Sequence, residues 1–248
     1  MKKKFAIGLL LGIFLVSFAL VGSARAIALG GGGGTTITMD SFVGTTLLMG
    51  DKVLGGIAAS VGYVGTATPI TLSNFTLTTF PTPANNPGFI MTSMPLAVVA
   101  LGSQDLTMSF VVATLPTSGM LIDDVSVSMV GGVIPGVTGG PPTLASATIE
   151  ENVYTANPIL GGTLLGSISI GATGTSSVLS GSISFAPVSS IFVIKDISVN
   201  GDGINGGAAN ISQVIQQFSQ VPVPVPPSVL FFAPGLLGLV GLRKRFFG

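Results

Sequence analysis

Short runs in which apolar residues alternate with Thr or Ser recur along the middle of the chain, and this pattern constrains the fold most. The runs at 70–80 and 125–129 are the clearest. Alternation with a period near two is typical of a strand that buries one of its faces. Comparable runs lie at 35–39, 45–49, 57–64, 96–101, 106–115, 145–153, 164–170, 181–185 and 191–199.

Clusters of Pro and Gly separate these runs. Those at 81–83, 85–88 and 139–142 break strands and favour turns. About ten strands joined by turns, without long helical periodicity, predict an all-β fold, an antiparallel β-sandwich with a jelly-roll-like strand order. The sequence Gly-Ser-Ile-Ser occurs at Gly166 and again at Gly181. We interpret this repeated sequence as two strands that face each other.

One segment fits two structures. Ile211, Val214, Ile215 and Phe218 have the spacing of an apolar stripe on a helix. The segment follows an all-β region and directly precedes the apolar C-terminal stretch, so we favour a last strand.

The N-terminus has the three parts of a secretory signal peptide. Met1 is followed by three Lys, an apolar stretch occupies 5–21, and Ala24 and Ala26 form a small-x-small cleavage site. Residues 1–26 are therefore predicted to be removed on export by a signal peptidase, the alternative being an uncleaved membrane anchor. A glycine-rich linker at 27–34 then leads into a β-sandwich domain at 35–220.

The C-terminal segment, 221–248, combines a proline-rich spacer, an apolar stretch at 229–242 and a basic cluster. We predict a short hydrophobic helix that holds the precursor in the membrane and leaves the cations in the cytoplasm. From Ser228 to Leu242 the helix would rise only about 22 Å, against a hydrocarbon core of about 30 Å. Pro234 and Gly235 interrupt it. A weak anchor of this kind suits a segment that is recognised and removed.

The order of these parts resembles the PEP-CTERM sorting segment of Gram-negative bacteria. The matching residues are Pro224, Val225, Pro226, Pro227 and Ser228, followed by Arg243, Lys244 and Arg245. Val225 stands where the family usually has Glu. The resemblance implies processing by an exosortase, an inner-membrane-anchored precursor, and a final place at the cell surface or in the extracellular matrix. The alternative is an ordinary C-terminal transmembrane anchor.

Charge and composition between the two signals exclude several functions. Nine acids and two bases, Lys52 and Lys195, give this part a net charge of −7, so it repels the phosphates of nucleic acid. The chain has no His, Cys or Trp. Zinc and copper sites lack their usual ligands, disulfides are absent, and most acid–base catalysis lacks its usual groups. We therefore expect no cofactor and no enzymatic activity.

Three groups of residues are candidates for a binding or catalytic site. Residues 200–207 have the oxygen ligands and glycines of a calcium loop, although Asn-Gly and Asp-Gly are more typical of hairpin turns. Asp123 with Asp124, and Glu150 with Glu151, could supply the two carboxylates of a glycoside hydrolase, but solvated strand ends are the simpler interpretation. Tyr63 and Tyr154 could stack on sugars or belong to the core or its rim.

The sequence therefore predicts an exported, non-catalytic protein with a structural or adhesive role at the cell surface or in an extracellular polysaccharide matrix. The alternative is a carbohydrate- or calcium-binding module. A carboxylate-based hydrolase ranks last.

Overall fold

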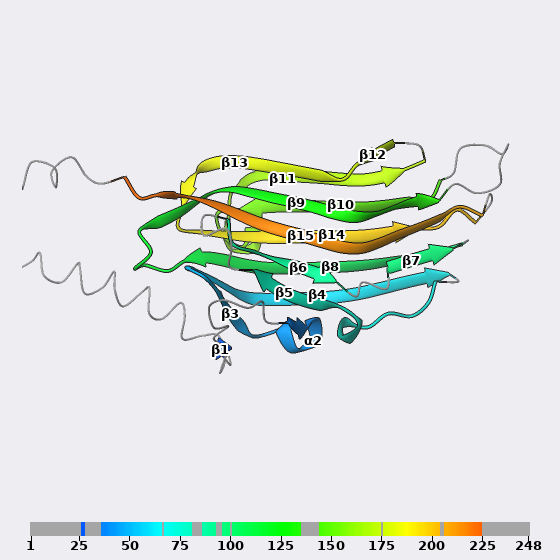
Figure 1. Cartoon of the computed structure of the whole chain (residues 1–248), viewed down its shortest axis with the longest axis horizontal. Helices are drawn as coiled ribbons and strands as arrows, with labels where there is room; N and C mark the ends of the chain where they lie inside the picture. Colours follow the sequence, from blue (N-terminus) through cyan, green and yellow to red (C-terminus); the bar gives the residue numbers. More distant parts are fainter. Residues whose placement is uncertain are drawn as a thin grey trace, which may run out of the picture.

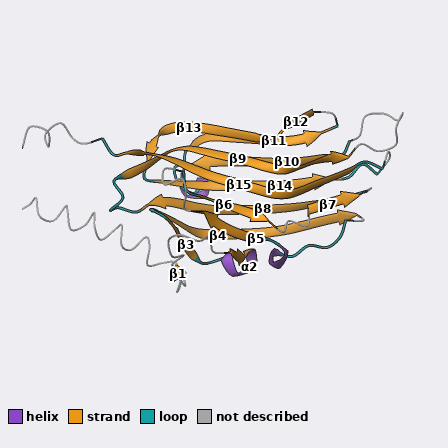
Figure 2. Ribbon diagram, viewed as in Figure 1, coloured by secondary structure: helices purple, strands orange, loops and turns teal. Residues whose placement is uncertain are grey.

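Two mainly antiparallel sheets make up the described part of the chain. The computed structural model describes residues 26–27, 36–65, 67–80, 86–92, 96–99, 101–134, 144–174, 176–203 and 206–224. Strands dominate this part, and the helical segments within it are short (Figure 2). They are α2 (Met39–Phe42) and two 3-10 turns, η1 (Leu72–Asn74) and η2 (Pro158–Leu160).

Sheet A contains eight strands. Their order across the sheet is β1 (Ala26–Ile27), β3 (Thr46–Met49), β4 (Lys52–Gly65), β8 (Gly102–Thr114), β14 (Ser190–Asn200), β10 (Ser146–Tyr154), β11 (Leu164–Thr173) and β12 (Ser176–Val178). All neighbours are antiparallel except β1 and β3, which run parallel.

Sheet B lies against sheet A. Its order is β13 (Ser180–Val188), β9 (Met120–Ile134), β15 (Ala208–Pro222), β6 (Gly88–Thr92), β5 (Thr76–Phe80) and β2 (Thr36–Thr38), and β7 (Leu96–Val99) also pairs with β15. In Figure 1, β9, β15 and β6 overlie β10, β14 and β8 of the other sheet. The chain passes repeatedly between the sheets, as from β8 to β9 to β10 and from β13 to β14 to β15. This confirms the all-β sandwich with a jelly-roll-like order.

The core is an apolar layer between the sheets. Three rings form its aromatic centre: Phe110 from sheet A contacts Phe89 and Phe218 from sheet B, with ring centroids 5.7 and 6.4 Å apart. All three side chains are fully buried. Edge-to-face packing of this kind adds to the free energy gained by removing the rings from water.

Most expected strands are present, but the boundaries differ. The ambiguous segment at 211–218 is strand, within β15, as favoured from the sequence. The expected single strand at 70–80 is wrong in its first half, because η1 occupies 72–74 and β5 begins at Thr76. The side chain of Asn74 stabilises that turn, since it accepts from the N–H of Thr71 at 2.8 Å, and the N–H of Asn74 donates to the carbonyl of Thr71 at 3.0 Å.

The two Gly-Ser-Ile-Ser strands do face each other. A Cβ placed on Gly181 of β13 would lie 2.7 Å from Cγ2 of Ile168 on β11, in the opposite sheet. The glycine therefore permits close approach of the two sheets at this edge.

The expected terminal signals lie largely outside the described residues. These include Ala24 and the sorting residues Val225, Pro226, Pro227, Ser228, Arg243, Lys244 and Arg245. Ala26 pairs with Thr46, and Pro224 is exposed just past the end of β15. Val221 and Pro222, expected in the terminal segment, belong to β15. Within the described ranges, no helix has the length and apolar character needed to span a bilayer.

Replacing Phe218 with Ala is expected to lower the free energy of unfolding by about 3–5 kcal/mol, because it leaves a cavity against the other two rings. Chemical denaturation measures this loss. Phe80→Ala, at a half-buried position, is the control and should cost clearly less. Equal losses would contradict the central place given to the aromatic cluster.

Candidate functional site

The outer face of sheet A carries a shallow pocket. Because side chains alternate along a strand, β4 turns Ala58 and Ser60 outward, and the register places Ser109 and Thr107 of β8 directly beside them. Ile194 of β14 lies next to Ser109 in the same row. Small side chains on β4 and β8 leave the face hollow at this point.

The turn η2 forms one wall of this pocket. Asn157 begins the turn and accepts from the N–H of Ile159 at 2.9 Å, and Gly161 ends it with a φ of 89°, which favours glycine. The pocket encloses about 370 Å³. Its lining comes from β4, β8, β14 and η2: Ala58, Ala59, Ser60, Thr107, Met108, Ser109, Asn157, Pro158, Ile159, Phe192 and Ile194.

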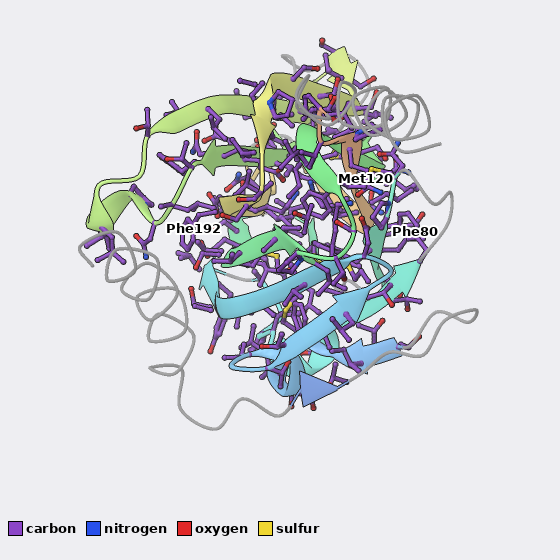
Figure 3. The ribbon with its side chains drawn as sticks, turned by 90° about the vertical axis from the view of Figure 1, so that its left-hand side faces the viewer. Phe80, Met120 and Phe192 are labelled. Atoms are coloured by element: carbon purple, nitrogen blue, oxygen red, sulfur yellow. The ribbon has the colours of Figure 1, made fainter. Side chains whose placement is uncertain are left out.

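Phe192 provides the aromatic surface of the pocket. Its side chain is 8% exposed, yet it does not belong to the core cluster between the sheets. In Figure 3 it lies on the opposite side of the sandwich from Phe80 and Met120, which come from sheet B. Tyr154 of β10 stands directly beside it in the sheet. Most of the Phe192 ring is covered, and the small part that stays exposed lines the pocket, where it offers an apolar surface to a ligand.

Oxygen acceptors continue this face beyond the pocket. Thr107 donates to Oδ1 of Asp196 at 3.0 Å, and Ser167 donates to Oδ1 of Asn152 at 2.6 Å. Glu150 stands directly opposite Asp196, and both are exposed. Like charges opposite each other destabilise a sheet, so this pair is not explained by the stability of the fold. Carboxylates accept hydrogen bonds and suit a ligand rich in hydroxyl donors.

Apolar side chains extend outward at the pocket wall. Ile159 is 90% exposed and Leu160 is 82% exposed. Together the outer face offers an open hollow, an aromatic ring, a protruding apolar wall and several acceptors. Such a surface can hold an elongated ligand with both apolar faces and hydroxyl groups.

The two acidic pairs lie in different surroundings, and the prediction that these acids are solvated strand ends is wrong for Glu151. Glu150 is exposed as expected, and Asp124 accepts from Ser184 and Ser219 on sheet B, at 3.1 and 3.2 Å. Glu151 is fully buried and not a solvated strand end. Adjacent residues point to opposite faces, so one glutamate of the pair had to enter the core.

Glu151 belongs to a buried polar cluster between the sheets, formed with Lys195 and Gln216. Glu151 of β10 forms an ion pair with Lys195 of β14, the residue opposite it in the register. Gln216 of β15 donates to Oε1 of Glu151 at 3.1 Å and to the carbonyl of Ser126 at 3.2 Å. Burial lowers the pKa of Lys195, and the charge of Glu151 opposes that shift.

Lys52 is buried separately, at the end of β4. Its Nζ donates to Oδ1 of Asp51 at 3.3 Å and to Oε1 of Gln220. Burial lowers its pKa, opposed by Asp51 and Asp123. Neither lysine reaches the pocket on sheet A.

On either side of the undescribed Ile204 and Asn205, the backbone pairs as a hairpin turn does, the simpler of the two interpretations. Asp202 pairs with Gly207, and the N–H of Gly206 donates to the carbonyl of Asp202 at 2.9 Å. The carboxylate of Asp202 accepts from the N–H of Leu144, also at 2.9 Å. Ile204 and Asn205 lie outside the described residues, and the described residues contain no group of three acidic ligands suited to a metal.

The two tyrosines are not brought together. Tyr154 lies beside Phe192 at the pocket end of the sheet, whereas Tyr63 pairs with Gln104 toward the other end of β4 and is half exposed. Sequence reasoning also missed Phe192, Ile194 and η2. A signal was present, because residues 191–194 are apolar at every position and so indicate burial on both faces of that strand.

Comparison with known proteins finds only distant similarity to solved structures. No protein-family model matches, and no curated protein is similar. A family 61 carbohydrate-binding module in complex with β-1,4-galactotriose is 15% identical, covering 60% of this chain and 89% of that one, with a TM-score of 0.29. A xylan-binding domain from Paenibacillus barcinonensis is 12% identical over 71% of this chain and 87% of that one, with a TM-score of 0.21. A carbohydrate-binding module of the β-sandwich superfamily is 10% identical over 70% and 58%, with a TM-score of 0.28.

Adjacent glutamates allow a matched test of the buried cluster. Glu151→Ala leaves Lys195 buried without its partner and is expected to cost about 3–5 kcal/mol of unfolding free energy. Glu150→Ala removes an exposed charge that faces Asp196 and should change stability by less than about 0.5 kcal/mol. Denaturant titration of both variants measures the difference. Similar values for the two would contradict the burial of Glu151.

Proposed function

We propose that the outer face of sheet A binds a carbohydrate chain, and that the protein is a non-catalytic glycan-binding module. The observation that carries the proposal is the pocket between Ser60, Phe192 and Ile159, with acceptor side chains continuing beyond it. Pyranose rings present apolar C–H faces and a rim of hydroxyl donors. An aromatic ring beside carboxylate and amide acceptors is complementary to both.

Charge narrows the ligand class. Glu150 and Asp196 lie on this face and the domain is strongly acidic, so uronic-acid polymers and sulfated glycans are repelled. We therefore infer a neutral polysaccharide. The open pocket suits internal units of a long chain better than a single enclosed sugar.

The carbohydrates associated with the similar solved structures define a first panel. They are β-1,4-galactotriose, xylan, a mixed-linked β-1,3-1,4-tetrasaccharide and an unsaturated mannuronic acid. The first three are neutral. The fourth carries a carboxylate and serves as the anionic comparison.

Two pockets on opposite outer faces allow the same substitution to be made at the proposed glycan site and at a control site. Ser60 lines the pocket on sheet A and Ser182 lines a second hollow on sheet B, and both side chains are exposed. Ser60→Trp fills the first pocket and is expected to reduce glycan affinity at least tenfold, whereas Ser182→Trp should leave it unchanged. Affinity electrophoresis with galactan, xylan and mixed-linked glucan, followed by calorimetry, measures this. Binding abolished by Ser182→Trp alone, or no binding to any neutral glycan, would overturn the proposal.

We infer further that the protein is exported and sorted to the cell surface or the surrounding matrix. The support is the order of the two terminal segments in the sequence, the second of which resembles a PEP-CTERM address read by an exosortase. A polysaccharide partner fits this location. In this proposal the module attaches the protein to extracellular polysaccharide in an adhesive or structural role.

Mass spectrometry of the protein from its native cells tests the export proposal. New termini are expected at Ile27 and near Pro226, because the two hydrophobic ends are then processing signals. Replacing Ala24 with a bulky Leu should block the first cut and leave the second. A mature protein that retains both Met1 and Gly248 would refute this reading of the ends, without bearing on glycan binding.

A further inference from the structure

Three side chains with complementary reactivity meet in the interior. Glu151 and Lys195 extend inward from sheet A, and Gln216 extends inward from sheet B. All three are 0% exposed. They bring an amine, a carboxylic acid and a carboxamide together in the buried layer between the sheets.

The carboxylate of Glu151 contacts both of the other groups. One of its oxygens, Oε2, pairs with Nζ of Lys195, and the other, Oε1, accepts from Nε2 of Gln216 at 3.1 Å. The amine and the amide nitrogen are therefore held by the two oxygens of the same carboxylate. A single acid in this position can exchange protons with both nitrogens.

Hydrogen bonding in the cluster is incomplete. Oε1 of Gln216 has no hydrogen-bond partner in the described part of the chain, and Nζ of Lys195 has none there beyond its ion pair. A buried ammonium group with one partner and a buried amide carbonyl with none are costly to the fold. Apolar residues of similar volume would serve packing better.

We infer that Lys195 and Gln216 form an intramolecular amide bond, with Glu151 as the acid–base group. In the step, a proton moves from the ammonium Nζ to the carboxylate of Glu151, and the neutral amine attacks Cδ of Gln216. The Nζ–Cδ bond forms, Glu151 gives its proton to Nε2 as the Cδ–Nε2 bond breaks, and it then takes the second proton from Nζ. The products are a secondary amide, one ammonia and a protonated Glu151, and no oxidant or other reactant is needed.

The surroundings favour this chemistry. Burial lowers the pKa of Lys195, which increases the fraction of neutral, nucleophilic amine. Gln216 is assigned as the electrophile because Glu151 contacts both nitrogens and so serves as the acid–base group. The resulting bond would join β14 of sheet A to β15 of sheet B in a chain that has no Cys for a disulfide.

Lys52 is the natural comparison. It also contacts a glutamine and an acid, Gln220 and Asp51, but there Nζ donates to the amide oxygen and Asp51 is partly exposed. Lys52 should therefore remain a free amine.

Peptide mapping of the denatured full-length protein distinguishes a free Lys195 from a Lys195 that is bonded to Gln216. Lys52 and Lys195 are the only basic residues in 27–242, so trypsin has two sites there. We expect cleavage after Lys52, complete resistance after Lys195, and a mass lower by one ammonia in a peptide that links Lys195 to Gln216. Lys195→Met and Glu151→Gln should restore the full mass, while Lys52→Met should keep the loss.

Several results would overturn the inference. These are an unmodified mass with cleavage after Lys195, a loss of water instead of ammonia, and a link between Lys52 and Gln220. Succinimide formation at an Asn-Gly pair also releases ammonia, but it leaves Lys195 open to trypsin and would count against the bond. The mass of the unmutated protein shows whether the amide bond is present, even where a variant fails to fold. The inference is independent of glycan binding.

Discussion

Burial of one face of each sheet against the other is the constraint on which the rest of the structure depends. With no disulfides, the described fold relies on apolar contact between the sheets, centred on Phe89, Phe110 and Phe218. That contact determines which side chain of each adjacent pair points inward. It therefore directs Glu151 into the interior and Glu150 into solvent, and it turns Phe192 toward the outer face. Both the pocket and the buried cluster follow from this alternation.

Alternation in the sequence was sufficient to predict the fold class and most strands, because a period of two is a local property. It failed at 70–75, where apolar and hydroxyl residues alternate but Thr71 and Asn74 cap a turn. Hydrogen bonding of side chains to the backbone competes with strand pairing there. The last strand, β15, was harder to predict because its apolar spacing fits a helix as well. Its place between β9 and β6 resolves the ambiguity.

The sites could be predicted only in part, because they depend on contacts between distant strands. The pocket combines β4, β8 and β14 with the turn after β10, and no local pattern indicates that these segments meet. The sequence singles out the acidic pair at 150–151. Which of the two glutamates is buried depends on which face β10 turns toward the other sheet, and this is not a local property of the sequence. Likewise, nothing local places Gln216 beside Glu151, because the two residues come from different sheets.

Both lysines of the described domain are buried, and this affects how copies of the protein meet. Its exposed charges, such as Asp40, Glu150 and Asp196, are all negative. Two such surfaces repel each other at low ionic strength, and the repulsion is screened over about 8–10 Å at physiological salt. Close association of two copies would therefore depend on salt, on divalent cations bridging carboxylates, or on a neutral polymer bound by both. Copies of the protein would then stay apart at low salt and associate at high salt, because Lys52 and Lys195 are buried and leave only negative charges exposed in the described domain.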